Sequence, residues 1–302
     1  MFAADMGIQA YVLEELRACS ECSWARLGLT CSLPNPSYLL VNSSQNCLYA
    51  VHGDGQEISA FRLDDPGVSL SPLGYRNLRG KNPVHLSADP SGKWVLVACL
   101  ASGSITCVKL EADGSLGKIA TTNFNDRVVC RSLANQSCSN PHQVVFDPSG
   151  KWLLVQDRGL DCVHILRLCT RTGNLGYMSC MNTKAGAGPR HLVFHPSIPW
   201  AYLVNELDST INVCQFDKET GSLSIRQTVS SLPEGYLGEN TGAAIVLHRG
   251  GRFLYVTNRG HDSIASFSIN AGTGALTSLG WTSAGGRKPR FMTATPNGAS
   301  LL

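Results

Sequence analysis

A unit of about 50 residues recurs along this chain, and the repeat constrains the fold more than any other feature of the sequence. Successive copies start 47, 58, 48, 53 and 47 residues apart, near Asn35, Asn82, Asn140, Gly188, Thr241 and Lys288. The sixth copy has hardly begun when the sequence stops at Leu302. We therefore interpret residues 1–302 as one domain built from copies of a single structural unit.

Each copy consists of short apolar or alternating runs separated by turn residues. In the copy from Asn82, the runs HLSAD, KWVLVAC and ITCVKL are divided by PSG and SGS, and a fourth run, GSLGKIATTNF, follows. β-Branched and aromatic residues with Pro-Ser-Gly turns are typical of strands in tight hairpins. Four antiparallel strands at this period predict an all-β fold, a β-propeller with four-stranded blades. Helical repeats are excluded because no 3.6-residue apolar period runs through the unit.

The two ends of the chain do not fall on blade boundaries. GIQAYVLEEL, from Gly7, matches the third strand of the unit, so the chain enters in the middle of a blade. Leu302 lies within the first hairpin of the sixth copy. A closed ring would need further carboxy-terminal strands to cover the open edges. We therefore expect a propeller that is truncated at its carboxyl end.

Charge and hydropathy exclude several classes of partner. The net charge is +3, and no basic run or basic-aromatic stripe indicates nucleic-acid binding. The amino terminus lacks the pattern of a secretory signal, and no apolar stretch is long enough to cross a bilayer. We expect a cytoplasmic protein without a membrane partner.

The sequence contains 12 cysteines, most of them inside apolar segments. Cys47, Cys99, Cys107, Cys162 and Cys214 are typical of small, reduced core residues. Cys19 and Cys22 form a CxxC pair, but no second pair or histidine pair stands at zinc-ligand spacing. We expect no metal and no cofactor.

Two positions of the repeat carry residues that a structural repeat does not require. In a propeller, the first strand of each blade lines the channel, and its start lies beside the end of the second strand in the same hairpin. Equivalent positions of successive blades should therefore surround one mouth of the channel. The third position holds Ser37, Val84, His142, Arg190, Ala243 and Arg290. The nineteenth position holds Gly53, Leu100, Arg158, Glu206 and Arg259.

These residues would create a positive mouth containing one carboxylate, Glu206, and one imidazole, His142. Arginine presents a planar fork that suits carboxylate or phosphate, so the expected ligand is a small anion. The alternative is that Glu206 only pairs with neighbouring arginines and locks the blades together. We favour the functional interpretation, because unlike residues that converge on one mouth are typical of a binding site.

The remaining histidines carry weaker signals. His85 and His191 stand at the fourth position, and strand alternation points them to the opposite face from the third. Such histidines more often pack between blades, and we retain His85 as a candidate substrate contact. No nucleophile elbow, phosphate loop or metal triad is present in the sequence.

Four longer segments, GAGPRHLVFHP, YLVNELDSTI, NPHQVVFDPSGKW and LYVTNRGHDSIASF, resemble the lactonase family of seven-bladed propellers. That family includes propeller-type 6-phosphogluconolactonases and carboxymuconate cyclases. The resemblance extends over nearly all of the chain from Gly7, with the family's last blade and a half absent. It implies a site of one His, two Arg and one Glu, which here are His142, Arg190, Arg259 and Glu206. The same residues stand at the two positions selected by the repeat.

The chain departs from the family pattern at two places. Ala244 stands where family members commonly have an acidic residue, and Cys99 and Leu100 replace an Asn-Tyr pair.

We expect Arg190 and Arg259 to hold the anionic group and the oxyanion, with His142 or Glu206 as the base. Arg158, Arg290 and His85 are the expected additional substrate contacts.

The function that the resemblance implies is hydrolysis of a small anionic sugar lactone, foremost 6-phosphogluconolactone. One alternative is cycloisomerisation of 3-carboxy-cis,cis-muconate, in which the same cations bind carboxylates and a proton moves at carbon. A second alternative is a non-catalytic propeller, which the two departures and the missing strands favour.

Overall fold

The computed structural model describes residues 2–4, 7–15, 22–64, 69–123, 138–295 and 297–302. These residues form one three-stranded and five four-stranded antiparallel sheets. Their one helical segment is the 3-10 turn Leu100–Ser102. The predicted all-β class and the four-stranded antiparallel blade are therefore confirmed.

The chain divides into two compact units. Unit 1 contains Met1–Asp126 and Cys169–Asn174, and unit 2 contains Arg127–Leu168 and Leu175–Leu302. The single-domain organisation expected from the repeat stays a prediction. Each unit is built from copies of the repeated sheet.

Unit 1 contains three sheets, with strand orders β1-β2-β3, β4-β5-β6-β7 and β8-β9-β10-β11. The strands are β1 (Phe2–Ala4), β2 (Gly7–Glu15), β3 (Cys22–Cys31), β4 (Pro36–Asn42), β5 (Cys47–His52), β6 (Glu57–Leu63), β7 (Leu70–Asn77), β8 (Pro83–Ala88), β9 (Trp94–Cys99), β10 (Ser104–Leu110) and β11 (Leu116–Asn123). The four runs read from the copy at Asn82 are β8 to β11. The strand boundaries of that copy therefore follow its Pro-Ser-Gly and Ser-Gly-Ser turns.

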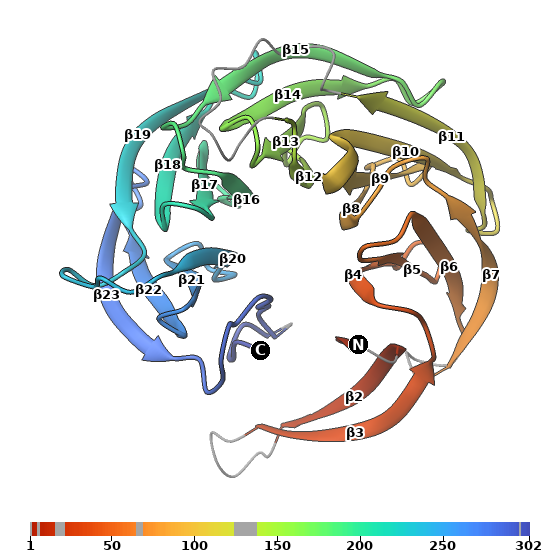
Figure 1. The fold of residues 1–302 in the computed structure, drawn as a ribbon, viewed down its shortest axis with the longest axis horizontal. Helices are drawn as coiled ribbons and strands as arrows, with labels where there is room; N and C mark the ends of the chain where they lie inside the picture. Colours follow the sequence, from red (N-terminus) through yellow and green to blue (C-terminus); the bar gives the residue numbers. More distant parts are fainter. Residues whose placement is uncertain (1, 5–6, 16–21, 65–68, 124–137, 296) are drawn as a thin grey trace. The chain divides into compact units, whose positions relative to one another are not determined.

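Unit 2 contains three four-stranded sheets, each with its strands in chain order (Figure 1). The strands are β12 (Pro141–Phe146), β13 (Leu153–Asp157), β14 (Cys162–Leu168), β15 (Leu175–Asn182), β16 (Pro189–Phe194), β17 (Trp200–Asn205), β18 (Thr210–Phe216), β19 (Leu223–Ser230), β20 (Thr241–Leu247), β21 (Phe253–Arg259), β22 (Ser263–Ile269) and β23 (Leu276–Ser283). The first strands β12, β16 and β20 are spatial neighbours. The carboxy-terminal residues fold back on themselves through an antiparallel bridge between Ala294 and Leu301.

An aspartate organises the turn between the first two strands of a sheet. In the turn after β12, the Asp147 carboxylate accepts hydrogen bonds from the amides of Ser149 and Trp152, at 3.1 and 2.7 Å. Gly150 takes a left-handed φ of 72° there, which glycine adopts at little cost. The same DPSGKW sequence therefore builds the same hairpin each time it recurs.

Neighbouring sheets of unit 2 are held together by aromatic side chains as well as by apolar packing. The Trp152 indole donates to the Lys218 carbonyl at 2.8 Å, and the Tyr202 hydroxyl donates to the Gly274 carbonyl at 3.0 Å. Gly221, with φ 76°, lies so close to Trp152 that a Cβ atom there would overlap the indole. The β18–β19 turn thus has glycine for two reasons, its backbone conformation and its contact with the preceding sheet.

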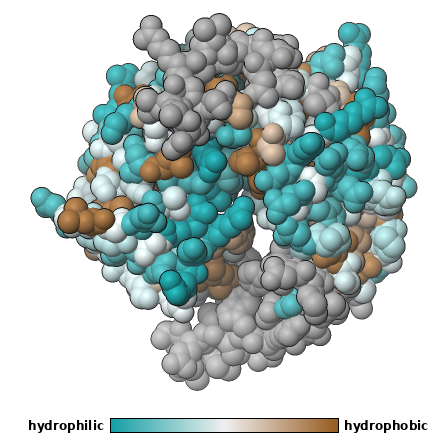
Figure 2. Space-filling model, viewed as in Figure 1, coloured by the Kyte–Doolittle hydropathy of each residue, from teal (hydrophilic) through white to brown (hydrophobic). Residues whose placement is uncertain are grey.

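The core lies between the sheets, and the surface is polar. Trp152, Leu154 and Val163 of one sheet pack with Leu192 and Leu203 of the next. Where Figure 2 is not grey, hydrophilic and neutral residues dominate and hydrophobic ones form small separate groups. The cysteines predicted in the core are all buried: Cys47, Cys99, Cys107, Cys162 and Cys214. Among the described residues, no helix is long and apolar enough to span a membrane.

The glycine contact can be tested with two matched substitutions. Gly221→Ala and Gly235→Ala both place a side chain at positive φ, but a Cβ atom at Gly235 would stand in open space. We expect Gly235→Ala to lower the free energy of unfolding by about 1 kcal/mol. Gly221→Ala should cost about 1–3 kcal/mol more, because the indole must move. Urea unfolding followed by tryptophan fluorescence measures both, and equal losses would contradict the proposed contact.

Candidate active site

Bulges at the start of the first strands present His142 and Arg190. In the β12–β13 ladder, Pro141 pairs with Asp157 and Gln143 with Gln156, so His142 is an extra residue in its strand. In the β16–β17 ladder, Pro189 pairs with Asn205 and His191 with Val204, which leaves Arg190 extra. A bulge interrupts the regular alternation and re-aims its side chain, and it is common beside functional sites.

The nineteenth position places the other charged residues beside these bulges. Arg158 directly follows β13, and its amide donates to the Asn140 carbonyl at 3.0 Å. Glu206 directly follows β17, and its amide donates to the Gly188 carbonyl at 2.7 Å. Arg259 ends β21 and pairs with Thr241, the first residue of β20. Hairpin pairing thus brings the end of the second strand to the start of the first in all three sheets.

The Glu206 carboxylate is the centre of the resulting cluster. Its Oε1 atom lies 2.8 Å from Arg158 Nη1 and 3.3 Å from Arg259 Nη2. Its Oε2 atom lies 2.9 Å from Arg190 Nε and 3.9 Å from His142 Nε2. Four side chains from three sheets therefore meet at the carboxylate of a fifth residue, Glu206.

Burial and charge are distributed unevenly across this cluster. The side chains of His142, Arg190 and Glu206 are 7, 3 and 9% exposed, whereas Arg158 and Arg259 are 32 and 19% exposed. Three guanidiniums share one carboxylate, so the cluster carries excess positive charge. Since two of them are open to solvent, an anion can approach from that side.

Backbone carbonyls hold two of the guanidiniums in place. Arg190 Nη1 donates to the Ala243 carbonyl at 2.6 Å, and Arg259 Nη2 donates to the Gly242 carbonyl at 3.3 Å. These carbonyls stand at a wider irregularity, where the β20–β21 pairing skips from Gly242 to Ile245. Ala244, where the resemblance to the family implies an acidic residue, is buried, and its amide donates to the Thr257 hydroxyl at 2.9 Å.

Burial and the surrounding cations set the protonation states. Burial, followed by Arg190, Arg158 and Arg290, holds the pKa of His142 well below its usual range. Burial lowers the pKa of Arg190 to about 9, although Glu206 opposes the shift. Burial alone would raise the pKa of Glu206, but Arg190, Arg158 and Arg259 outweigh it and the net pKa is lowered. At neutral pH the cluster therefore contains a neutral imidazole, an ionised carboxylate and charged guanidiniums.

Arg290 and His85 are the other two predicted substrate contacts. Arg290 is exposed, and its charge contributes to lowering the pKa values of His142 and Arg190. His85 belongs to unit 1, where its buried ring lies 4.3 Å from the Tyr38 ring. A substrate contact by His85 stays a prediction.

His191 contacts the neighbouring sheet, which agrees with its predicted packing between blades. Its ring meets the ring of His142 edge-on, with centroids 5.2 Å apart. Its position on the opposite face from Arg190 stays a prediction, because bulges at His142 and Arg190 interrupt the regular alternation. The sequence contains no signal for a bulge at these positions beyond the preceding proline.

The structure offers no alternative metal centre among the residues it describes, where no three His, Cys, Asp or Glu side chains gather at metal-binding distance. Cys19 of the CxxC pair lies outside the described residues. The expectation for that pair therefore stays a prediction.

Comparisons with known proteins agree with the geometry. The family model "Lactonase, 7-bladed beta-propeller" matches residues 10–302. The 6-phosphogluconolactonase of Bacillus subtilis is 30% identical over 98% of this chain and 83% of its own length. An uncharacterised protein of Lactococcus lactis subsp. cremoris is 33% identical over 94% of this chain and 80% of its own length. The structure of the periplasmic gluconolactonase PpgL of Pseudomonas aeruginosa superposes with a TM-score of 0.87 at 27% identity, over 98% of this chain and 84% of that one.

The protonation state of His142 leads to a pH prediction. Its folded-state pKa lies well below the ordinary value of 6.5, so protons bind the unfolded chain first as the pH falls. The contribution of the neutral imidazole to the free energy of unfolding is therefore complete above pH 6.5. Below pH 6.5 this contribution decreases by at most about 1.4 kcal/mol for each pH unit. We expect the NMR signals of the His142 ring to show no titration between pH 8 and 6.5. A midpoint near 6.5 would contradict the assignment.

Proposed function

We propose that the chain hydrolyses a sugar lactone that carries an anionic group, on the premise that it belongs to the lactonase family of 7-bladed β-propellers. The substrate we propose is 6-phosphogluconolactone, which is the substrate named for the Bacillus subtilis relative. The observation that carries the proposal is the excess of guanidinium groups around the buried Glu206 carboxylate. Such a cluster is costly to bury unless an anion completes it.

The partly exposed arginines bind the anionic group of the substrate. Arg158 Nη1 donates to Glu206 Oε1, Arg259 Nη2 forms an ion pair with the same oxygen, and both side chains are partly exposed to solvent. Arg290 is exposed, and no carboxylate in the described part of the chain pairs with it. Guanidinium forks match phosphate oxygens in pairs, so these three side chains suit the 6-phosphate.

Hydrolysis needs a base that removes a proton from water while the water oxygen attacks the lactone carbonyl carbon. The ring C–O bond then breaks, and the departing ring oxygen takes a proton to become a hydroxyl group. His142 is the better base of the two candidates, because its low pKa leaves it unprotonated at neutral pH. Glu206 is held ionised by three guanidiniums, and its lone pairs are engaged with them.

Glu206 then has an electrostatic role. It fixes Arg190 and Arg259 on either side of one carboxylate, within reach of the position where negative charge develops on the carbonyl oxygen. Positioned donors of this kind typically stabilise an oxyanion by about 3 kcal/mol each. Arg190 is further fixed by its bond to the Ala243 carbonyl. The cluster is therefore organised before the substrate arrives, and the reaction requires little rearrangement of it.

The role of His142 predicts a rate effect that chemistry can reverse. His142→Ala should lower kcat for 6-phosphogluconolactone by about 100-fold or more, measured above the spontaneous rate, and added imidazole should restore part of it. His248→Ala removes a histidine from the β20–β21 turn and should leave kcat unchanged. Unchanged kcat in His142→Ala would overturn the assignment.

In ¹⁸O-labelled water the product should gain one ¹⁸O, whereas cycloisomerisation of a muconate would incorporate none.

The role of Arg290 predicts a change in substrate preference. Arg290→Ala should reduce kcat/KM for 6-phosphogluconolactone by about tenfold, the effect of one charge-assisted hydrogen bond. The unphosphorylated gluconolactone has no group for this side chain, so its kcat/KM should stay the same. Arg226→Ala, which removes an exposed arginine bonded to Gln215, is the matched control. An equal loss for both lactones would exclude phosphate recognition by Arg290.

A further inference from the structure

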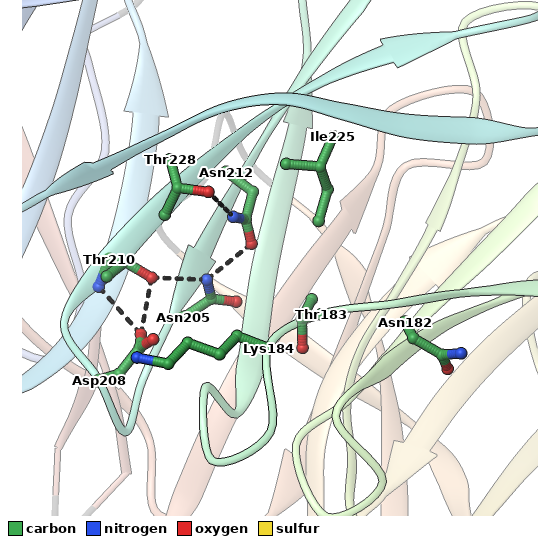
Figure 3. A pocket seen from close by; sticks show the side chains of 9 residues that line it. All are labelled: Asn182, Thr183, Lys184, Asn205, Asp208, Thr210, Asn212, Ile225 and Thr228. Carbon is green, nitrogen blue, oxygen red and sulfur yellow. Dashed lines mark hydrogen bonds between the residues drawn. The ribbon is translucent and has the colours of Figure 1, made fainter.

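Unit 2 contains a cavity of about 500 Å³ whose lining shares no residue with the charged cluster (Figure 3). It lies between the end of β15 and the strands β17, β18 and β19. Most of its lining side chains are amides and hydroxyls, and Ile225 contributes an apolar wall. Lys184 and Asp208 are its two charged residues, and the Lys184 ammonium extends toward the Asp208 carboxylate in Figure 3. The lining therefore has no net charge.

The hydrogen bonds in this cavity have a fixed direction. Asp208 Oδ1 accepts from the Thr210 amide at 3.2 Å and from the Thr210 hydroxyl at 2.7 Å. Because that hydroxyl has only one proton, its oxygen must accept from Asn205 Nδ2, at 2.8 Å. The second proton of Asn205 Nδ2 goes to Asn212 Oδ1 at 2.7 Å, and Asn212 Nδ2 donates to Thr228 Oγ1 at 2.8 Å. The carboxylate thus determines which way the Asn205 amide faces.

One buried acceptor is left over by this network. Asn205 is 1% exposed, and its Oδ1 atom has no hydrogen-bond partner among the described residues. A buried carbonyl oxygen without a donor is costly, by about 1–3 kcal/mol. Asn205 is one of the residues that line the cavity (Figure 3), so a molecule bound there can supply the missing donor.

The next sheet of unit 2 shows how the equivalent asparagine finds its donors. Asn258, at the position equivalent to Asn205, has the Ser231 hydroxyl at 2.7 Å and the Asn240 amide nitrogen at 3.3 Å from its Oδ1 atom. The residue equivalent to Ser231 is Thr183, whose hydroxyl donates to the Asp161 carbonyl at 3.0 Å, and Ala187 stands where the next sheet has Asn240.

The same comparison explains the open volume. The facing pair Asn212 and Thr228 of β18 and β19 is replaced by Ala265 and Trp281 in β22 and β23. The Trp281 indole donates to the Ser231 carbonyl at 2.8 Å, so it reaches across to the preceding loop. The cavity therefore lacks two features of the neighbouring sheet: a donor to the Oδ1 atom of the asparagine, and an indole that fills the space.

We propose that this cavity binds a small neutral molecule with several adjacent hydroxyl groups, such as a monosaccharide or a sugar alcohol. Hydroxyls donate and accept, so one can donate to Asn205 Oδ1 while others meet Lys184 and Asp208. A lining without net charge does not favour an anion, in contrast to the guanidinium cluster. The volume suits a ligand of this size. The inference does not depend on the proposed lactonase activity.

The proposed binding site can be tested by introducing the residue pair that the neighbouring sheet has at the equivalent place. The double variant Asn212→Ala with Thr228→Trp grafts the Ala265–Trp281 pair into the cavity. Asn205→Ser is a second variant that removes the acceptor without filling the space. Thr277→Trp, at an exposed threonine of β23, is the matched control. Binding of D-glucose and of sorbitol is measured by saturation-transfer NMR and titration calorimetry.

We expect saturable one-to-one binding of at least one probe to the parent chain and to Thr277→Trp. Binding should weaken about tenfold or more in each cavity variant. Inorganic phosphate, which we expect to bind at the guanidinium cluster, should not displace the probe. The proposal is overturned if neither probe binds saturably, if binding persists in both cavity variants, or if phosphate competes. None of these outcomes depends on lactone hydrolysis, so the two proposals can fail separately.

Discussion

The charged cluster depends on one buried carboxylate, that of Glu206, because arginines from three different sheets pair with it. Arg158, Arg190 and Arg259 would repel one another without it, and with it they still carry excess positive charge. Desolvating such a group costs several kcal/mol, which only further hydrogen bonds and an incoming anion can offset. This cost is the reason that we favour the proposed anion-binding role of Glu206 over a purely structural one.

The first hairpin of each sheet in unit 2 departs from regular pairing where these side chains stand. His142 and Arg190 both occupy bulges, and the β20–β21 pairing skips two residues beside the carbonyls that hold Arg190 and Arg259. The loss of ladder pairing at these points frees carbonyls and re-aims side chains, which an uninterrupted sheet could not do. Since every sheet of unit 2 starts in this way, the repeated hairpin supplies a place for a functional residue in each copy, and the residue types there decide the chemistry.

Much of the architecture could be read from the sequence, because strand period and turn residues are local properties. The copy at Asn82 predicted its four strands, and hairpin pairing predicted the meeting of positions three and nineteen. The contact between His191 and His142 was not predicted, because it depends on a one-residue bulge after Pro141 and Pro189, and strand period alone does not indicate a bulge. The cavity beside Asn205 was missed for a different reason: its polar residues are ordinary turn and strand residues, and only the direction of their hydrogen bonds distinguishes them.

Comparison between copies reveals what a single copy cannot. Asn205 and Asn258 are equivalent and equally buried, yet Ser231 satisfies the Oδ1 atom of Asn258 while that of Asn205 stays open within the described structure. Equivalent hairpins with the same asparagine should be closed by the same means unless something else supplies the donor. Asn205 also immediately precedes Glu206, and Thr183 and Lys184 lie in the segment that leads to Arg190. A ligand in the cavity would therefore restrain the backbone segments that carry Glu206 and Arg190, the two partners of this ion pair. The cavity and the charged cluster are thus linked through the backbone, although they share no residue.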